Sequence, residues 1–568
     1  MKLICILFSL FSFTLSAQVI KKENLTPKEK NYYDFQKTQL ESIGSYYKDP
    51  LGESRDKHGK WLYYDRFGTL TEERNYYRGK LHGRVISMYS NGKNKQEGYF
   101  KMGEQDSVFR EWNETGKLKT QGYYHFGKPV GIWEYYYLTG QKKQVEEIID
   151  STAYLREFWM PDSLHTQKVK DGNGEYLTFF DTGMEKEWYN YKNGLKDGPF
   201  EEYSIYGYLL INGKFKEGQK DSTWNFFYYT GKKEKISNYV NGKLDGEYKY
   251  FYDNDQLNVE GFYKNGEKTG LWTWYTKKGT KDMQGSFDEG KQNGKWTYWY
   301  PTGELSYYAE YDHDKKTGTW EYFYKDGSKF KTGSFQNDEK NGQWNTWYEN
   351  GTLLMSGKYV KGKEEGTWVN YWDNGKEKNI ATFKNGLLSG KWESYFPTGK
   401  PNVFGNYKEG EKSGEWTSFF ENGKPKDVIN YKVITKKSKI KNGPLKDFDV
   451  KESVKDGHSV SFSQKDYRKT EEGDYKNGEK DGVWYTYWPG GKIPSNTTTY
   501  KNGLLDGKST ELDRRGNPVS ETEYKDGLKH GKMKIYDKRG KVAKELEFQF
   551  GQQVIKGAGG SNIEFRTR

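Results

Sequence analysis

The dominant feature of this sequence is a Gly-x-aromatic motif that returns every 24 residues over most of the chain. A fixed period of this length is typical of a repeat protein in which each repeat packs against its neighbours. About nineteen repeats fit between residues 56 and 551, and Ser107 and Ser222 replace the glycine twice. The motif glycines are Gly59, Gly83, Gly131, Gly174, Gly198, Gly246, Gly270, Gly294, Gly318, Gly342, Gly366, Gly390, Gly414, Gly482, Gly507 and Gly531.

We number the places of one repeat from 1 to 24, so that Gly294 is place 1 and Trp296 is place 3. Most tryptophans of the chain fall at place 3, which chance does not produce. They are Trp61, Trp133, Trp224, Trp272, Trp296, Trp320, Trp344, Trp368, Trp392, Trp416 and Trp484.

Each repeat carries two turn signals. Asn-Gly often occupies places 9 and 10, as at Asn350-Gly351, and places 20 and 21, as at Asn265-Gly266. Asn-Gly between aromatic-rich runs predicts a two-residue β-hairpin turn, because both residues tolerate positive φ. We therefore expect two short strands and two tight turns in every repeat, with no helix.

A two-residue turn at places 9 and 10 also predicts the strand register. Place 7 is then opposite place 12, place 3 opposite place 16, and place 1 opposite place 18. Place 16 is commonly Gly, which packs nothing within a strand, so we expect the tryptophan at place 3 to lie across it. The alternation puts places 3, 5 or 7, 12 and 18 on an aromatic face, with Lys, Thr, Glu and Asp on the other.

The composition agrees with a thin structure. Hydrophobic residues make up 33% of the chain and aromatic residues 18%, so aliphatic side chains are too scarce for a compact core. A disordered chain would lack the aromatic residues. The predicted fold is all-β: an extended antiparallel β-hairpin repeat array that forms a single-layer meander.

Two stretches interrupt the period, and each holds about 20 extra residues. Insertions in repeat arrays usually project from one face, but degenerate repeats explain the spacing equally well. The predicted organisation begins with a signal peptide at 1–17 and a linker or short helix at 18–55. Repeats follow at 56–140, 174–424 and 458–551, separated by insertions at 141–173 and 425–457. A tail at 552–568 ends the chain.

The first residues are typical of a signal peptide. Lys2 precedes an apolar run from Leu3 to Leu15, and Ser16-Ala17 provides small residues for cleavage before Gln18. The run is too short to span a bilayer. We expect export to the periplasm, the outer membrane surface or the extracellular space. The single cysteine, Cys5, lies in this run, so the mature chain would have no disulfide or cysteine metal site.

The net charge of +12 is spread along the chain, with basic and acidic residues interleaved. This pattern indicates a solvated repeat surface and argues against nucleic-acid binding. Weak attraction to an anionic lipid or polysaccharide stays open.

The segment 263–272, YKNGEKTGLW, resembles the MORN repeat in its bacterial variant form, found in antitoxin-like (YwqK-type) repeat proteins. The resemblance extends over about 56–551. It implies a β-hairpin array with a binding or scaffolding role, whose partners are proteins or acidic membrane lipids. It brings no catalytic motif, and an export signal does not suit a cytoplasmic antitoxin.

No chemical motif emerges from the remaining residues. His58 and His82 fall at place 24 of adjacent repeats and could stack, but two imidazoles without a third ligand make a weak metal site. The chain has no phosphate loop and no Gly-x-Ser-x-Gly motif. We expect no enzyme, no cofactor and no metal.

The favoured hypothesis is an exported scaffold that binds a protein partner, or itself, through its aromatic face. A single-layer sheet cannot bury both faces, and contiguous apolar surface usually marks an interaction. Binding of an envelope glycan by stacked Trp and Tyr rings is the alternative, and an antitoxin-like immunity role is a third. The candidate binding residues are Trp272, Trp296, Trp320, Trp344, Trp368, Trp392 and Trp416.

Overall fold

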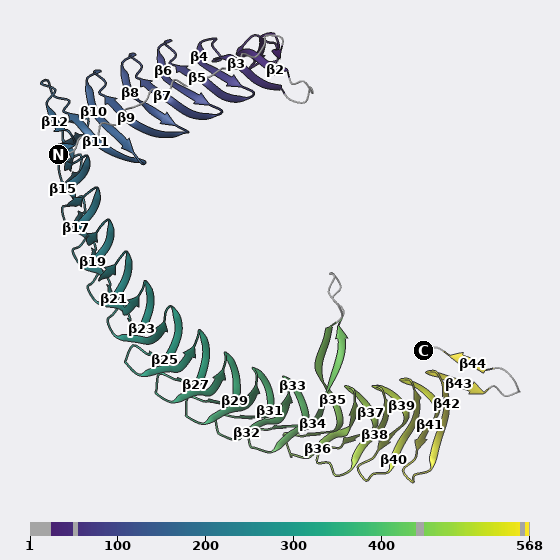
Figure 1. The fold of residues 1–568 in the computed structure, drawn as a ribbon. Helices are drawn as coiled ribbons and strands as arrows, with labels where there is room; N and C mark the ends of the chain where they lie inside the picture. The colour runs from purple at the N-terminus through teal and green to yellow at the C-terminus, as the bar shows by residue number, and fades with distance from the viewer. Residues whose placement is uncertain (1–23, 49–54, 439–447, 557–562, 567–568) are drawn as a thin grey trace. The chain divides into compact units, whose positions relative to one another are not determined.

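The computed structural model describes residues 24–48, 55–438, 448–556 and 563–566. All 44 of its secondary-structure elements are β-strands, which confirms the all-β prediction. The chain divides into two units, Met1–Glu267 and Lys268–Arg568. Within each unit, every strand pairs antiparallel with the next strand of the chain, so each unit is a meander of successive hairpins (Figure 1).

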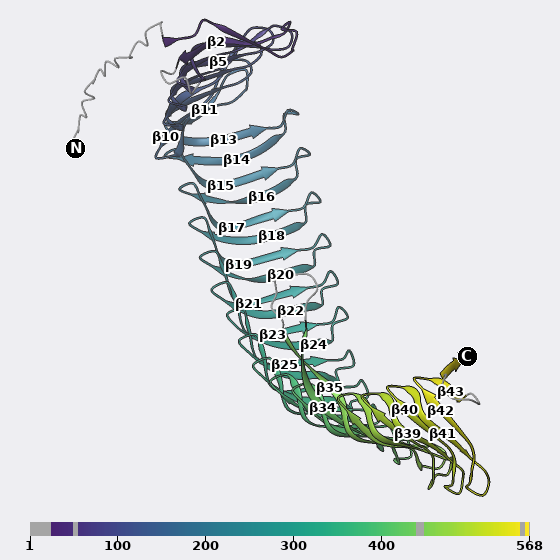
Figure 2. The same ribbon diagram turned by 90° about the vertical axis from the view of Figure 1, so that its right-hand side faces the viewer.

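Figure 2 shows strands of the first unit side by side as stacked hairpins. Its strands are β1 (Glu29–Tyr32), β2 (Leu40–Lys48), β3 (Arg55–Tyr64), β4 (Leu70–Tyr77), β5 (Lys80–Met88), β6 (Asn94–Lys101), β7 (Glu104–Trp112), β8 (Leu118–His125), β9 (Lys128–Tyr136), β10 (Lys142–Ile149), β11 (Thr152–Trp159), β12 (Gln167–Lys170), β13 (Asn173–Phe179), β14 (Glu185–Lys192), β15 (Leu195–Tyr203), β16 (Leu209–Lys216), β17 (Gln219–Phe227), β18 (Lys233–Val240), β19 (Lys243–Phe251) and β20 (Leu257–Lys264).

The second unit continues with the same hairpin pattern. Its strands are β21 (Glu267–Tyr275), β22 (Lys281–Asp288), β23 (Lys291–Trp299), β24 (Leu305–Asp312), β25 (Lys315–Phe323), β26 (Lys329–Gln336), β27 (Glu339–Trp347), β28 (Leu353–Val360), β29 (Lys363–Tyr371), β30 (Glu377–Lys384), β31 (Leu387–Tyr395), β32 (Pro401–Lys408), β33 (Glu411–Phe419), β34 (Pro425–Ser438), β35 (Phe448–Phe462), β36 (Lys469–Lys476), β37 (Glu479–Tyr487), β38 (Pro494–Lys501), β39 (Leu504–Leu512), β40 (Pro518–Lys525), β41 (Leu528–Tyr536), β42 (Val542–Gln549), β43 (Gln552–Lys556) and β44 (Ile563–Arg566).

The strand register follows the prediction over most of a hairpin and departs from it at the turn. In β23–β24, Gly294 pairs with Tyr311 and Trp296 with Ala309, as predicted, but a shift then pairs Trp299 with Leu305. The predicted two-residue turn at places 9 and 10 is therefore wrong. The amide of Gly303 donates to Tyr300 O (2.8 Å) and that of Tyr300 to Glu304 O (2.8 Å), so the loop has three residues and ends in a left-handed glycine, Gly303 (φ 106°).

This extra loop residue changes one face assignment. Leu305, at place 12, pairs with the ring at place 6, and therefore lies on the face opposite to Trp296 rather than beside it.

The second turn of the repeat matches its prediction. Asn265 (φ 52°) and Gly266 (φ 93°) both have positive φ, as a two-residue type I′ turn requires.

The glycine at place 1 lies in a β-bulge. Gln284 pairs with Thr297 and Ser286 with Asn293, so Gly285 alone faces the three residues Gly294–Trp296. Gly294 has a φ of 73°, which residues with a Cβ adopt only at a cost in energy. The period of 24 residues is therefore the spacing of these bulges, and Ser222 has φ of 60° at the same place.

The two predicted insertions differ from one another. Residues 141–173 stay within the sheet, because β11 pairs with both β10 and β12, and they form a shortened, degenerate repeat. Leu155, Phe158 and Val169 from this segment join a buried cluster with rings of the following repeats. Residues 425–438 and 448–457 form the long arms of the hairpin β34–β35, which stay paired out to Ser438 and Phe448 and extend beyond the neighbouring strands (Figure 1).

The chain ends also differ from the prediction. Residues 18–55 contain β1 and β2 in place of a linker or helix, and 552–568 contain β43 and β44 in place of a loose tail. Gly44 of β2 lies against the ring of Trp61, so this segment supplies a glycine that does for the first full repeat what the place-16 glycine does for the others. The predicted signal peptide, 1–17, lies outside the described residues.

Replacing the bulge glycine tests whether its backbone conformation holds the repeat. A Cβ at Gly294 would meet no atom within 4 Å, so Gly294→Ala adds only the cost of a left-handed alanine, roughly 1–2 kcal/mol. We expect Gly294→Ala to speed amide hydrogen exchange in β22–β24. Ser222→Gly places a glycine at the equivalent left-handed position and should slow amide hydrogen exchange around β17. Lys291→Ala, at an exposed extended position, is the control; equal exchange in all three variants would contradict this role.

Candidate functional site

The predicted aromatic face is the core of the sheet and not an exposed surface. Six of its seven tryptophans, Trp272, Trp296, Trp320, Trp344, Trp368 and Trp416, are only 1–5% exposed. Trp392 is half-buried. The prediction that these rings present a continuous binding surface is therefore wrong.

The burial of Trp296 shows how a single layer buries its rings. The indole lies flat on Gly285 of the preceding hairpin, where an added Cβ would approach Trp296 Cδ2 to 2.0 Å. Its Nε1 donates to Ser286 O (3.2 Å), and Phe287 packs edge-on at 5.1 Å between ring centroids. The predicted rescue of glycine by tryptophan occurs, but with the ring of the next repeat, since Gly285 is paired with Trp272.

The same contact recurs in both units. Alanine replaces the glycine ahead of two tryptophans, with different results: Trp320, which follows Ala309, is 5% exposed, whereas Trp392, which follows Ala381, is half-buried. The glycine–tryptophan contacts are Gly44–Trp61, Gly122–Trp133, Gly213–Trp224, Gly285–Trp296, Gly333–Trp344, Gly357–Trp368, Gly405–Trp416 and Gly473–Trp484.

Lysine side chains cover the outer side of these rings. The Nζ atoms of Lys268, Lys340 and Lys412 lie 4.5, 4.9 and 4.4 Å from the ring centroids of Trp272, Trp344 and Trp416. Their aliphatic stems shield the aromatic column from water, while the ring faces attract the charge. Burial nevertheless lowers the pKa of Lys268. This cover removes the unpaired apolar face on which the binding hypothesis depended.

A Tyr or Trp at place 7 links several repeats to the next. Tyr300 Oη donates to Phe323 O (2.8 Å), Tyr324 Oη to Trp347 O (2.8 Å), and Trp372 Nε1 to Tyr395 O (3.1 Å). Each bond runs from one loop to the end of a strand in the following repeat, which fixes the spacing of successive loops.

Exposed apolar side chains gather on the loops of the first unit. Five successive loops, from β9–β10 to β17–β18, lie along one edge of the sheet and carry side chains that are 43–85% exposed. We call this surface the apolar loop edge. Its residues are Leu138, Leu164, Met184, Ile205, Tyr206, Tyr208 and Tyr229.

Adjacent loops of this edge lie close together, since Met184 Cε is 3.0 Å from the position of a Cβ on Gly207. Sequence reasoning missed the edge, although the signal was present. Place 8 holds Leu138, Ile205 or Tyr229 here, whereas Lys325 and Glu349 occupy it in the second unit.

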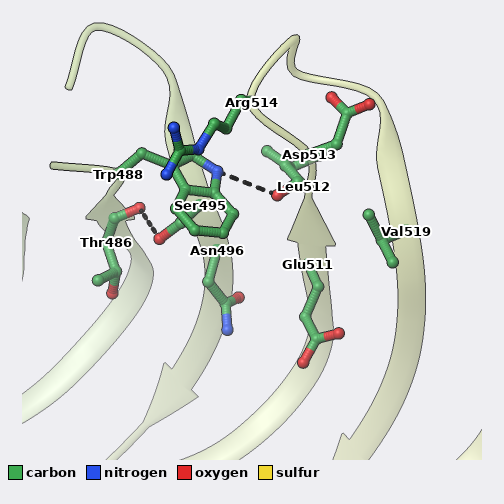
Figure 3. Close-up of a pocket in the computed structure, with 9 residues that line it drawn as sticks. All are labelled: Thr486, Trp488, Ser495, Asn496, Glu511, Leu512, Asp513, Arg514 and Val519. Carbon is green, nitrogen blue, oxygen red and sulfur yellow. Dashed lines mark hydrogen bonds between the residues drawn. The ribbon is translucent and has the colours of Figure 1, made fainter. Parts of the chain in front are cut away.

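A groove of about 690 Å³ opens on the second unit, between the loops that follow β37 and β39 (Figure 3). We call it the Trp488 groove. Trp488 Nε1 donates to Leu512 O (3.2 Å), and the Arg514 guanidinium carbon is 5.6 Å from the indole centroid. The groove is lined by Thr486, Trp488, Ser495, Asn496, Glu511, Leu512, Asp513, Arg514 and Val519.

In the part of the chain that the structure describes, no three His, Cys, Asp or Glu side chains are grouped to hold a metal ion. The rings of His58 and His82 both pack on Tyr77, at 5.4 and 5.6 Å, so the two imidazoles are separated by a phenol ring. The pKa of His58 is lowered mainly by burial and, to a smaller extent, by the positive charge of Arg78. Among the described residues, no helix combines the length and apolar character needed to cross a membrane.

These features define a β-hairpin repeat protein whose tryptophans form an internal column. A family model described as the MORN repeat variant matches six segments of the chain, which lie at 57–76, 244–265, 292–313, 364–385, 412–432 and 529–549. The chain therefore carries MORN-variant repeats at these positions. No curated protein matches the sequence.

Some solved structures match with low similarity. A structure of TcdB2-TccC3 is 12% identical, with 93% of this chain and 33% of the other covered and a TM-score of 0.13. A structure of TcdB2-TccC3 without the hypervariable C-terminal region is also 12% identical, with 93% of this chain and 32% of the other covered and a TM-score of 0.12. A structure of alternansucrase in complex with isomaltononaose is 14% identical, with 60% of this chain and 23% of the other covered and a TM-score of 0.12. The chain spans at most about a third of these structures, and TM-scores this low carry no argument.

Adding a methyl group under one indole tests the glycine–tryptophan contact. A Cβ at position 357 would lie 2.0 Å from Trp368 Cδ2, so Gly357→Ala should push the ring outward and destabilise the repeat by roughly 1–3 kcal/mol. Hydrogen exchange in β28–β29 and acrylamide quenching of tryptophan fluorescence should both increase. Ala381→Gly should decrease the quenching by letting Trp392 lie flat. Unchanged quenching in both variants would contradict the contact.

Proposed function

We propose that this protein is an exported, non-enzymatic repeat scaffold that binds a protein partner through the apolar loop edge of the first unit. The observation that supports this is the exposure of seven large apolar side chains on five successive loops. Monomeric proteins rarely expose contiguous apolar surface without an interaction to cover it.

The residue types of the edge suit a protein partner. Tyrosine and methionine are enriched in protein interfaces, and Tyr206, Tyr208 and Tyr229 add hydroxyl groups that can hydrogen-bond at the rim of a contact. Loops of successive hairpins are separated by two strands, about 10 Å, so the apolar groups recur at short intervals along the edge. The lysine-covered tryptophans offer no comparable surface.

The finer family expectation, a bacterial antitoxin-like repeat protein, is compatible with the six matched repeats, but export would separate the protein from a cytoplasmic toxin. The glycan alternative loses its original site, because the place-3 rings are buried.

Polar substitutions on the loop edge test partner binding. Tyr206→Ser combined with Tyr229→Ser removes two rings that are 76% and 70% exposed, and we expect at least about tenfold weaker capture of the partner. A photo-crosslinking residue at position 205 would detect the partner in cells. Lys325→Ser with Glu349→Ser, at equivalent loops of the second unit, is the control.

A crosslinked species that survives the double tyrosine substitution would contradict the proposal. A species with twice the mass of the chain, confirmed by sedimentation of the purified protein, would instead identify the partner as a second copy.

Export has a separate test. If residues 1–17 are a cleaved signal peptide, the protein recovered from the cell envelope or medium should begin at Gln18. Ala17→Arg should block this cleavage and leave a longer precursor. Recovery of the chain from the cytoplasm with Met1 retained would contradict export.

A further inference from the structure

The Trp488 groove lies where a row of side chains across the strands holds no aromatic ring. In the middle of the second unit, Met283, Tyr298, Tyr307 and Tyr322 face one another across successive strands, and Tyr298 stacks on Tyr307 at 4.1 Å. At the groove, the equivalent row across the strands is Thr486, Asn496 and Glu511. These shorter side chains leave the row unfilled by rings.

The indole of Trp488 forms a fixed wall of this space. Its N–H bond to Leu512 O holds the ring against the loop of the next repeat, and Arg514 lies near the ring (Figure 3). The volume of about 690 Å³ is within the range of small-molecule sites, roughly 300–1,000 Å³.

Polar groups of both signs surround the ring. The carboxylate of Glu511 is exposed and accepts a bond from Ser520 Oγ (2.8 Å). The carboxylate of Asp513 accepts hydrogen bonds from the backbone amides of Arg515 and Asn517 (both 2.8 Å), which hold the loop. These bonds, that from the Asn517 amide most of all, lower the pKa of Asp513. Arg514 brings a guanidinium group with several N–H donors.

This charge pattern restricts the ligand. Two carboxylates disfavour an anion, and Arg514 disfavours a cation. A planar apolar ring beside both hydrogen-bond donors and acceptors suits a neutral molecule that has a C–H face and many hydroxyl groups. Hydroxyl groups both donate and accept, so they can satisfy Glu511 and Arg514 together.

We propose that the Trp488 groove binds a neutral oligosaccharide, with one sugar ring stacked on the indole. This site is independent of the apolar loop edge, since it lies on different loops in the second unit. The tryptophan involved is at place 7, and not at the buried place 3 on which the glycan alternative originally rested.

The test is isothermal titration of the full chain with neutral gluco-, xylo-, galacto- and chito-oligosaccharides. We expect at least one of these probes to bind, and Trp488→Ala to weaken its binding by at least about tenfold. Trp488→Phe should retain part of the affinity, because it keeps a ring. Glu511→Ala should weaken binding more than Glu511→Gln, which keeps a hydrogen-bonding oxygen.

Trp372→Ala is the matched control. Trp372 also lies at place 7 and donates the same kind of inter-repeat hydrogen bond, to Tyr395 O (3.1 Å). It should leave sugar binding unchanged, and circular dichroism should show intact β-structure in every variant. Three results would overturn the proposal: no binding of any probe up to its solubility limit, equal losses in Trp372→Ala and Trp488→Ala, or tighter binding of acidic than of neutral oligosaccharides.

Discussion

The contact between an indole ring and a glycine on the preceding hairpin is the interaction on which the rest of this structure depends. A sheet of one layer has no second layer to pack against, so it must bury its rings within its own thickness. Trp296 achieves this by lying flat on Gly285, with Ser286 O accepting its N–H bond. Since the ring and the glycine belong to consecutive repeats, most of the stabilising contacts are between nearest neighbours.

Much of the fold follows from the sequence because the repeat presents the same local signals many times. The register of Trp296, the second turn at Asn265-Gly266 and the rescue of glycine by an aromatic ring were all predictable from spacing. The first turn was not, because Asn-Gly is compatible with more than one loop length, and only the paired backbone distinguishes them. The choice of ring for each glycine was also beyond the sequence, since both neighbouring strands offer a tryptophan.

The candidate site was predicted less well, for a physical reason. Sequence periodicity identifies which residues share a face, but not how completely lysine stems and edge-on rings cover that face. The tryptophan column was therefore mistaken for a surface. The features that do reach solvent lie away from the place-3 motif: apolar residues such as Tyr206 in loops that are otherwise polar, and the groove beside Trp488 over short residues such as Thr486. In an array of this kind, irregular positions carry more information about binding than the regular motif does.

The hydrogen bond from place 7 gives the array a direction. Tyr300 reaches forward to Phe323 and Tyr324 to Trp347, so these side chains at place 7 donate toward the C-terminal side. Excising or duplicating one whole repeat would leave every such donor with an acceptor of the same type. Inserting or deleting a few residues would instead leave a tyrosine hydroxyl without its carbonyl acceptor. Such a gene can change the length of its product by unequal recombination in whole steps, and any ligand-binding loops would be carried along the ribbon to new separations without rebuilding what lies between them.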